Sequence, residues 1–453
     1  MNKKPLLFIF RRDLRLADNT SLIDACKQKQ VIPCFIFTPQ QIDKNEYRSD
    51  NAIQYLINSL REIEKQIKIF GGKFYVFYGD NLEVLKSIKN IISGVCINAD
   101  YTPFSRKRDK SIQDFCFNNN LEFYSSDDAI LNHPEKVLNG LGNPYGVFTP
   151  YFKNAQKIPV KKPDYFKDFN FFSKDINNEH IIDYTFIESK IKPNQLCLKH
   201  GGREEALNDL KAIKSFERYN ETRDFPEISG TTKISAHLKF GTLSIREVYH
   251  KIFKNLGPNH SLLRQLYWRE FYIHIQFFRP DVYENNYNKK YDKVKWDNNE
   301  KYFNLWCEGK TGFPIVDAGM RELNTTGYMH NRVRMIVASF LTKDLHINWK
   351  KGEKYFAQKL VDYDPALNNG NWQWAASTGC DAQPYFRIFN PWSQQKKFDI
   401  NCIYIKKWVK ELEGLSSKEI HNLDTKFDSR PTNYPPPLVD HGLERLEAIS
   451  RFA

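Results

Sequence analysis

Apolar residues follow two different patterns along the chain. Over residues 1–127, short apolar runs alternate with stretches in which apolar residues recur every three or four positions. The runs predict strands at 6–10, 31–37, 74–78, 94–98 and 121–124. The stretches between them predict helices at 21–27, 52–69, 82–92 and 105–118. Strands that alternate with helices favour a doubly wound α/β domain with a parallel sheet over residues 1–127.

The remainder of the chain lacks comparable strand signals. Residues 128–200 are rich in Pro, Asn and Lys and show no sustained period, so we interpret them as an inter-domain linker that runs over the surface. From residue 201 onward, apolar residues recur at helical spacing at 206–219, 245–256, 262–278, 314–324, 330–345 and 355–361. This second pattern predicts an all-helical domain over residues 201–453.

Composition narrows the class of protein. Charged residues make up 27% and aromatic residues 15% of the chain, which is typical of a globular protein. The formal charge of +13 is compatible with a polyanionic partner, but a Lys-rich composition alone leaves nucleic acid undecided. The eight cysteines form no CxxC pair and no metal spacing with His, so we expect reduced thiols and no metal site. No apolar run reaches the length of a membrane span, so we expect a soluble, cytoplasmic protein.

The first predicted strand ends in a turn without phosphate-binding glycines. Residues 10–15 read FRRDLR, where a dinucleotide-binding fold would carry GxGxxG. The turn therefore argues against a redox flavoprotein that takes its electrons from a nicotinamide.

The densest group of polar and aromatic residues lies in the helical half. Residues 362–374 contain two acids, three Asn and two Trp. Because buried polar groups need partners, this stretch predicts the wall of a site for a large ligand that is both polar and aromatic. Upstream, a hydroxyl-rich turn before a helix indicates either an anion site or a simple N-cap, at Gly230, Thr231, Thr232 and Ser235.

Two predicted helices carry cations among other polar or aromatic side chains. We predict one continuous helix over residues 330–350, which places Asn331, Arg334 and Met335 on one face. Arg334 is expected to form a buried ion pair with Asp362. On the helix at 262–278, three neighbouring residues suit either a flipped base or a core Trp beside a surface Arg, and residue type alone favours the second: Gln265, Trp268 and Arg269.

Four stretches resemble a single protein family. FRRDLRLADN (10–19) is similar to the N-terminal start of the photolyase/cryptochrome flavoproteins. TGFPIVDAGMREL (311–323) and NRVRMIVASFLTKDLHINWK (331–350) match two signature stretches of that family. DYDPALNNGNWQWAASTGCDAQPYFRIFNP (362–391) resembles the bacterial class I DNA photolyases in particular. The resemblance covers nearly the whole chain.

The resemblance implies FAD bound in a U shape within the helical domain. The phosphates and ribityl chain of FAD would meet Tyr219, Thr231, Thr232, Lys233, Ile234 and Ser235. Its ring system would lie against Arg334, Asp362, Tyr363, Asp364 and Asn368. Asn368 would face flavin N5, where an amide cannot take up a proton as an Asp could, which suits an anionic reduced flavin. An electron relay would run, from proximal to distal, through Trp372, Trp349 and Trp296.

The resemblance also implies a reaction. Blue light excites reduced FAD, an electron passes to a cyclobutane pyrimidine dimer in UV-damaged DNA, the ring splits, and the electron returns. The protein holds the flipped dimer against the flavin and excludes water. The residues on the DNA side would be Arg223, Gln265, Trp268, Arg269, Asn331, Arg332, Met335 and Gln394. We expect a monomer with no membrane partner and no obligate protein partner.

One position departs from the class I pattern. Class I enzymes usually carry Glu where this chain has Gln265, and Gln there is more familiar in (6-4) photolyases and cryptochromes. A (6-4) enzyme would carry paired His where residues 329–332 read MHNR, so a cyclobutane dimer is the favoured substrate. The segment after Asp399 resembles the short end of photolyases, whereas cryptochromes commonly carry extended tails. A (6-4) photolyase or a cryptochrome-type blue-light receptor is the alternative.

The α/β domain would hold a second chromophore that acts as an antenna. The resemblance implies either methenyltetrahydrofolate or 8-hydroxy-5-deazaflavin, in a pocket lined by residues 98–111.

Overall fold

The computed structural model describes residues 4–424 and 433–453, which form two compact units. The sheet unit comprises Met1–Asn194, Lys199–Ser215 and Lys233–Pro280. The helical unit comprises Gln195–Leu198, Phe216–Thr232 and Asp281–Ala453. These units do not coincide with the predicted domains, because the sheet unit includes most of residues 128–200 and helices that follow residue 201.

A five-stranded parallel sheet organises the sheet unit, with strand order β3-β2-β1-β4-β5. In this sheet Leu6 of β1 pairs with Val31 of β2 on one side and with Gly94 of β4 on the other. The predicted doubly wound α/β arrangement is confirmed, and three predicted strands match to the residue because each is a short, fully buried apolar run. The strands are β1 Leu6–Phe10, β2 Val31–Phe37, β3 Tyr75–Tyr78, β4 Gly94–Asn98 and β5 Glu122–Ser126.

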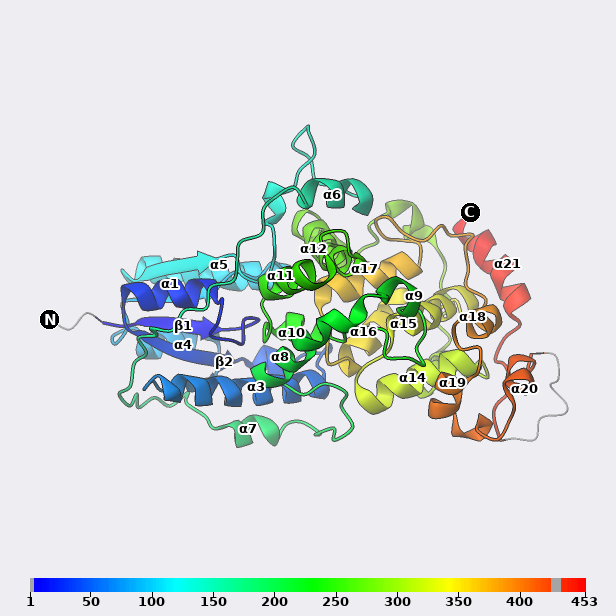
Figure 1. Ribbon diagram of the computed structural model, residues 1–453, viewed down its shortest axis with the longest axis horizontal. Coiled ribbons are helices and arrows are strands. Elements are labelled where there is room, and N and C mark those ends of the chain that lie inside the picture. The colour runs from blue at the N-terminus through cyan, green and yellow to red at the C-terminus, as the bar shows by residue number, and fades with distance from the viewer. Residues whose placement is uncertain (1–3, 425–432) are drawn as a thin grey trace. The chain divides into compact units, whose positions relative to one another are not determined.

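Helices flank the strands, with α1 on one side and α3 on the other (Figure 1). All five of these helices begin at a side chain that accepts a hydrogen bond from the first turn, namely Asn19, Thr38, Ser49, Asp80 and Thr102. Such caps satisfy N–H groups that a helix start leaves unpaired. The helices are α1 Thr20–Gln28, α2 Pro39–Ile42, α3 Asp50–Ile69, α4 Asn81–Ile88 and α5 Pro103–Asn118.

The segment predicted as a linker packs along this sheet. Val31 donates its N–H to Asn170 (2.9 Å) and accepts from Phe172 (2.8 Å), while Ile182 donates to Val76 (2.9 Å). The segment also contains helices α6 Phe148–Ala155 and α7 Tyr184–Glu188. It therefore covers sheet surface and satisfies backbone groups of β2 and β3.

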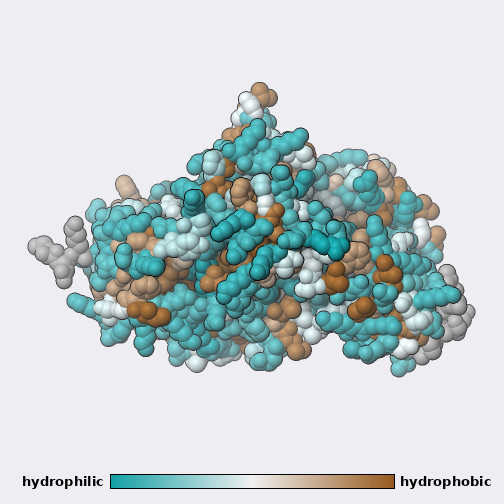
Figure 2. Space-filling view, viewed as in Figure 1, coloured by the Kyte–Doolittle hydropathy of each residue, from teal (hydrophilic) through white to brown (hydrophobic). Residues whose placement is uncertain are grey.

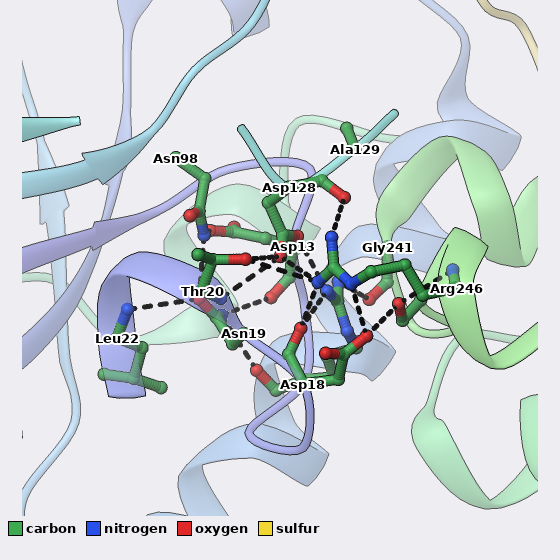
Figure 3. A network of polar contacts seen from close by, with 12 residues as sticks. Asp13, Asp18, Asn19, Thr20, Leu22, Asn98, Asp128, Ala129, Gly241 and Arg246 are labelled. Atoms are coloured by element: carbon green, nitrogen blue, oxygen red, sulfur yellow. Dashed lines mark hydrogen bonds and ion pairs between the residues drawn. The ribbon is translucent and has the colours of Figure 1, made fainter. Parts of the chain in front are cut away.

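A buried polar network ties later helices into the sheet unit (Figure 3). Arg246 binds Asp18 (2.9 Å) and Asp128 (2.8 Å), and Arg15 binds Asp128 at 2.7 Å. Burial opposes the charge of Asp128, but the two arginines lower its pKa to about 2. Removing one partner of such a buried group costs on the order of 3–5 kcal/mol, so the network holds these helices strongly. The later helices of the sheet unit are α8 Arg203–Lys211, α10 Ser235–Phe240, α11 Ile245–Leu256 and α12 Ser261–Phe278.

The helical unit has its own apolar core, in which Trp306, Met320 and Phe340 are fully buried. Its α-helices are α9 Tyr219–Thr222, α13 Glu300–Glu308, α14 Pro314–Thr326, α15 Asn331–Ser339, α16 Trp349–Lys359, α17 Pro365–Ala375, α18 Pro391–Phe398, α19 Ile403–Trp408, α20 Ser417–His421 and α21 His441–Phe452. Across both units, short 3₁₀ segments lie at Pro134–Lys136, Ala212–Phe216, Pro280–Tyr283, Lys289–Lys293 and Lys410–Leu412.

The prediction of one continuous helix over residues 330–350 is wrong. After α15 the chain makes a π-helical turn at Phe340–Asp344, and α16 begins only at Trp349. His346 adopts a left-handed conformation with φ of 49°, and the Asn348 side chain accepts from Lys350 to cap α16. Because Asn is a preferred N-cap residue, the sequence held a signal for this break that the apolar spacing obscured.

Polar residues dominate the face shown in Figure 2, where apolar residues form only small scattered groups. In the part of the chain that the structure describes, no helix is both long enough and apolar enough to cross a membrane.

Candidate functional site

An ion pair between Arg334 of α15 and Asp362 confirms the predicted bridge in the helical unit. Arg334 Nη2 lies 3.1 and 3.0 Å from the two Asp362 carboxylate oxygens, and its Nε donates to the Met329 carbonyl at 2.8 Å. Burial acts to lower the pKa of Arg334, but Asp362 outweighs it and the pKa is raised. Asp362 is 3% exposed whereas Arg334 keeps 25% of its side chain accessible, so the carboxylate is the more deeply buried partner of the pair.

Helix α17 begins beside this pair and carries the next polar group. Asp364 caps the helix by accepting from Ala366 (3.0 Å) and Leu367 (3.4 Å), with Pro365 in the first turn. One turn later, Asn368 Nδ2 donates to the Glu353 backbone carbonyl (2.9 Å) and to Glu353 Oε1 (3.0 Å). Since both partners are acceptors, the orientation of the Asn368 amide is fixed by chemistry.

Not every polar residue of the 362–374 stretch faces a ligand. Asn369 donates to the Val282 carbonyl at 3.1 Å. Gln373 donates to the same carbonyl at 2.9 Å and accepts from Tyr287 at 2.8 Å. These two amides hold the segment at 282–287 in place. The stretch therefore combines a structural face with the face that bears Asp362, Asp364 and Asn368.

Trp372 and Trp349, the predicted proximal and middle relay residues, lie on packed helices. Trp372 of α17 and Trp349 at the start of α16 are 2% and 1% exposed. A Cβ on Gly352, one turn after Trp349, would stand 2.2 Å from Trp372 Cη2. Trp349 donates its indole N–H to Asn286 Oδ1 at 2.9 Å. The missing side chain at Gly352 therefore lets Trp372 reach the helix that carries Trp349.

The segment around Trp296 is joined to the turn before Trp349. Asp297 donates its backbone N–H to the His346 carbonyl at 2.9 Å, and Asn348 donates its own to Asn298 Oδ1 at 3.0 Å. The structure thus brings the segments of all three predicted relay residues into one continuous part of the helical unit.

Sequence reasoning overlooked three side chains in this region. Glu353 orients Asn368, Asn286 holds the Trp349 indole, and the buried Trp306 ring lies 6.2 Å from the ring of Trp372. Glu353 stands among lysines in α16, so its burial was not evident from the sequence. Asn286 and Trp306 act through contacts distant in sequence, for which the sequence offers no pattern.

Most of the DNA-side residues predicted in the helical unit are half-buried, whereas Asn331 is exposed. Arg332 binds Asp224 at 2.7 Å and covers the Phe398 ring at 4.3 Å, and Arg223 lies 5.8 Å from the Tyr219 ring. Asn331 donates to the Met335 sulfur at 3.7 Å. The side-chain oxygen of Gln394 is buried and has no hydrogen-bond partner among the described residues.

The other predicted DNA-side residues lie on α12 of the sheet unit. Trp268 is half-buried and stacks in parallel on Phe148, with 3.6 Å between ring centroids and 5° between planes. Arg269 is 6% exposed and donates to the Ala129 carbonyl at 2.7 Å and to Glu270 at 3.3 Å. The expectation of a core Trp beside a surface Arg is therefore reversed, and Gln265 is half-buried one turn before Arg269.

The predicted phosphate segment crosses from one unit to the other. Tyr219, Thr231 and Thr232 belong to the helical unit, whereas Lys233, Ile234 and Ser235 belong to the sheet unit. Lys233 has a left-handed φ of 51°, and Ser235 is the first residue of α10. Predicted roles of these residues toward FAD stay predictions.

Comparison with known proteins shows which family this chain belongs to. Residues 6–165 match the model described as DNA photolyase, and residues 262–453 match the FAD binding domain of DNA photolyase. A deoxyribodipyrimidine photo-lyase of Alkalihalophilus pseudofirmus is 36% identical, over 98% of this chain and 96% of that protein. This chain belongs to the DNA photolyase family.

Solved photolyase structures share both the fold and the length of this chain. An archaeal photolyase from Sulfolobus tokodaii, solved with two FAD molecules, is 39% identical, with a TM-score of 0.89 and 99% of each chain covered. A bacterial class III photolyase from Agrobacterium tumefaciens is 33% identical, with a TM-score of 0.91 over 100% of this chain and 98% of that one. The predicted family and the predicted combination of a parallel sheet with a helical part are confirmed. The narrower likeness to class I photolyases stays a prediction.

Proposed function

We propose that this protein repairs DNA by splitting cyclobutane pyrimidine dimers with an electron from photoexcited reduced FAD. Family membership and the FAD-binding match over residues 262–453 support a flavin-dependent photolyase. The observation that carries the proposal is the side-chain set in the helical unit. The Arg334–Asp362 pair, the Asn368 amide oriented by Glu353 and the tryptophans of the same unit support an electron-transfer site there.

The residues of the helical unit fit FAD chemically. Arg334 keeps a quarter of its guanidinium side chain accessible beside a buried carboxylate, which suits the polar edge of a flavin ring. Asp362, Tyr363 and Asp364 would line that ring, and Asn368 would face N5. Phosphates would be held by hydroxyls and backbone N–H groups of Thr231–Ser235 together with Tyr219. When bound, reduced FAD supplies the electron that light transfers to the dimer.

The tryptophans would keep that cofactor reduced. Trp372 donates an electron inward under light, and Trp349 and Trp296 move the resulting hole outward in turn. Burial of Trp372 and Trp349 excludes water from the inner part of this path. The Asn286 acceptor fixes the Trp349 indole through its N–H, which keeps the ring in one orientation for transfer.

DNA would be held mainly through its phosphates, without reading sequence. The stack of Trp268 on Phe148 gives α12 a rigid aromatic platform, which suits a base turned out of the helix. Six residues are proposed to contact the lesion or its phosphates: Arg223, Gln265, Arg332, Asn331, Met335 and Gln394. The buried side-chain oxygen of Gln394, which accepts no hydrogen bond from the described residues, would accept one from the DNA. Arg269, which is buried, would act by holding α12 in place.

The sheet unit is proposed to bind an antenna chromophore with an anionic group. β1 and β4 are neighbours from which the strand order runs in opposite directions, and ligands of such folds bind at this switch point. Arg11 directly follows β1 and binds Asp109 at 2.6 Å, beside Arg108. Among the residues that the structure describes, one buried nitrogen of Arg11 and one of Arg108 have no hydrogen-bond partner. Burial and Arg108 lower the pKa of Arg11 to about 10, so an anion here would relieve unfavourable charge.

Three pigments carry such an anion: a methenyltetrahydrofolate, an 8-hydroxy-5-deazaflavin and a second FAD, as in the Sulfolobus tokodaii photolyase. Denaturing the purified holoprotein and identifying the released pigments by mass spectrometry distinguishes them. Arg11→Gln together with Arg108→Gln should lose the second pigment and retain the FAD of the helical unit.

The lesion is tested with two matched DNA duplexes, one with a single cyclobutane dimer in a restriction site and one with a (6-4) photoproduct there. Reduced protein should restore cleavage of the first duplex under blue light and not in the dark. Gln265→Glu should raise the yield per photon, because a Glu carboxyl held in its protonated form donates a stronger hydrogen bond to the pyrimidine radical anion than an amide does. Restoration of only the second duplex would assign a (6-4) photolyase, and restoration of neither would favour a light receptor.

A further inference from the structure

Helix α21 is held within the helical unit by polar side-chain contacts along its whole length. His441 at its first turn binds Asp344, and Glu444 binds His346 at 2.7 Å. At its last turn, Arg451 binds Asp297 at 2.8 and 3.0 Å. Of these partners, Asp344 ends the π-helical turn, His346 lies between that turn and Trp349, and Asp297 directly follows Trp296.

Arg451 contacts the residues on both sides of Trp296. Its Nη1 donates to the Lys295 carbonyl at 3.2 Å as well as to Asp297, while its Nε donates to Glu447 at 2.7 Å. The hydrogen bonds that Arg451 donates to the Asp297 carboxylate raise the pKa of Arg451. A bidentate guanidinium with a second acceptor on the same segment leaves that segment little freedom to rotate.

Phe452 covers the Trp296 ring. Its own ring is 2% exposed and meets Trp296 edge to face, with centroids 5.9 Å apart and planes at 83°. The other neighbours of Phe452 are Tyr291, at 5.6 Å between centroids, and the Lys343 ammonium nitrogen, 3.2 Å from the ring centre. Lys343 is 1% exposed, its nitrogen has no hydrogen-bond partner, and burial lowers its pKa well below the usual range. The side of Trp296 that meets Phe452 is therefore apolar and shielded from water.

We propose that Arg451 and Phe452 are positioning residues that set how long an electron hole survives on Trp296. The proposal rests on the proposed role of Trp296 as the distal relay residue. When Trp296 gives an electron to oxidised Trp349, its indole becomes a cation radical. That radical either regains an electron from the inner chain or loses its N–H proton to water, after which a thiol reductant returns one electron and water one proton.

The shield formed by Phe452 slows the second route. Proton loss needs a water molecule that can solvate the departing proton, and an apolar cover removes water from one side of the ring. The Arg451 clamp keeps the ring beneath that cover. Opening the cover should therefore speed proton loss from oxidised Trp296 and prolong charge separation.

The test is flash photolysis of the FAD holoprotein with the flavin oxidised, following absorption of the tryptophan cation radical and its neutral radical. Phe452→Ala should convert the first signal to the second several-fold faster, and Phe452→Tyr should restore the wild-type rate. Arg451→Gln should act in the same direction through loosening of the Trp296 segment. Leu446→Ala, on the exposed face of α21 where Leu446 is 61% accessible, is the matched control and should keep the wild-type rate.

A second readout does not depend on the photochemistry. Amide hydrogen exchange at Asp297, whose N–H binds the His346 carbonyl, should accelerate in Arg451→Gln and stay unchanged in Leu446→Ala. Unchanged radical kinetics in both folded variants, Phe452→Ala and Arg451→Gln, would overturn the proposal. If only one of the two variants folds, unchanged radical kinetics in that variant would overturn the proposal.

Failure of the proposed function would look different. In that case wild-type protein would form no tryptophan radical, or Trp296→Phe would leave the long-lived radical signal intact.

Discussion

Trp372 packs directly against Gly352, so that a Cβ there would stand 2.2 Å from Trp372 Cη2. The contact joins α17, which carries the proposed flavin residues, to α16, which carries Trp349. Gly352→Ala should bring a helix-propensity gain of about 1 kcal/mol, offset by about 1–3 kcal/mol from overpacking. We expect a net loss in the free energy of unfolding and slower photoreduction, because Trp372 must shift.

The measurements for Gly352→Ala are urea unfolding and the rate of flavin photoreduction. Gly414→Ala is the matched control, since an added Cβ there meets nothing within 4 Å. Wild-type rates and stability in Gly352→Ala would show that the Trp372 contact is not tight.

Replacing Trp372 separates two electron-transfer roles. In Trp372→Phe, photoreduction of oxidised flavin should slow strongly because Phe is much harder to oxidise than Trp. Repair by chemically pre-reduced enzyme should stay near the wild-type level. The control is Trp392→Phe, another buried Trp, which packs 5.1 Å from Phe313. Equal loss of photoreduction and repair in Trp372→Phe would rule out the relay assignment.

Asn368 is held by Glu353, and a second carboxylate there would change the chemistry at the proposed position of flavin N5. Asn368→Asp places two acids within about 3 Å, and like charges at that distance raise the pKa of one of them. We therefore expect the rate of photoreduction to become dependent on pH, with faster uptake of a proton by the site at low pH. Asn371→Asp, exposed on the same helix, should keep the wild-type profile. A flat profile in both variants would place N5 away from Asn368.

His274 on α12 should make the sheet unit sensitive to acid. Burial lowers the pKa of His274 from 6.5 to about 4, and its Nε2 accepts the Tyr145 N–H at 3.1 Å. Between these values the unfolded chain gains a proton that the folded chain does not, so stability present above pH 6.5 is lost as pH falls toward 4. The shift corresponds to about 3 kcal/mol.

His274→Gln should therefore unfold more easily than wild type at neutral pH, with a difference that shrinks as the solution is acidified. Urea denaturation at several pH values measures that difference. If it stays constant across this range, His274 does not titrate as its burial indicates.

The sequence pattern predicted those strands and helices that depend on neighbouring residues alone. Strands such as Val31–Phe37 are short apolar runs, and helices such as Ile245–Leu256 show a clear apolar period, so both were found to the residue. The apolar pattern did not predict the break before Trp349, because apolar residues keep their spacing through the π-helical turn.

Long-range contacts were out of reach of the sequence pattern. Arg246 joins α11 to Asp18 and Asp128, and this buried network places helices of the second half in the sheet unit. Likewise, the sequence pattern favoured a surface position for Arg269, which in the structure is buried and donates to the Ala129 carbonyl. Within the site, the Arg334–Asp362 pair was predicted from charge and spacing, whereas Glu353 and Asn286 became visible only through the hydrogen bonds they make.

The central claim is that light absorbed by bound reduced flavin splits the cyclobutane dimer. An action spectrum tests it most directly: repair of a dimer-containing oligothymidylate by reduced protein, measured as recovery of thymine absorbance at each wavelength. Repair per incident photon should follow the absorption of the bound reduced flavin together with its antenna, and should vanish in the dark and in FAD-free protein. Repair in the dark, or at wavelengths that neither pigment absorbs, would contradict the claim.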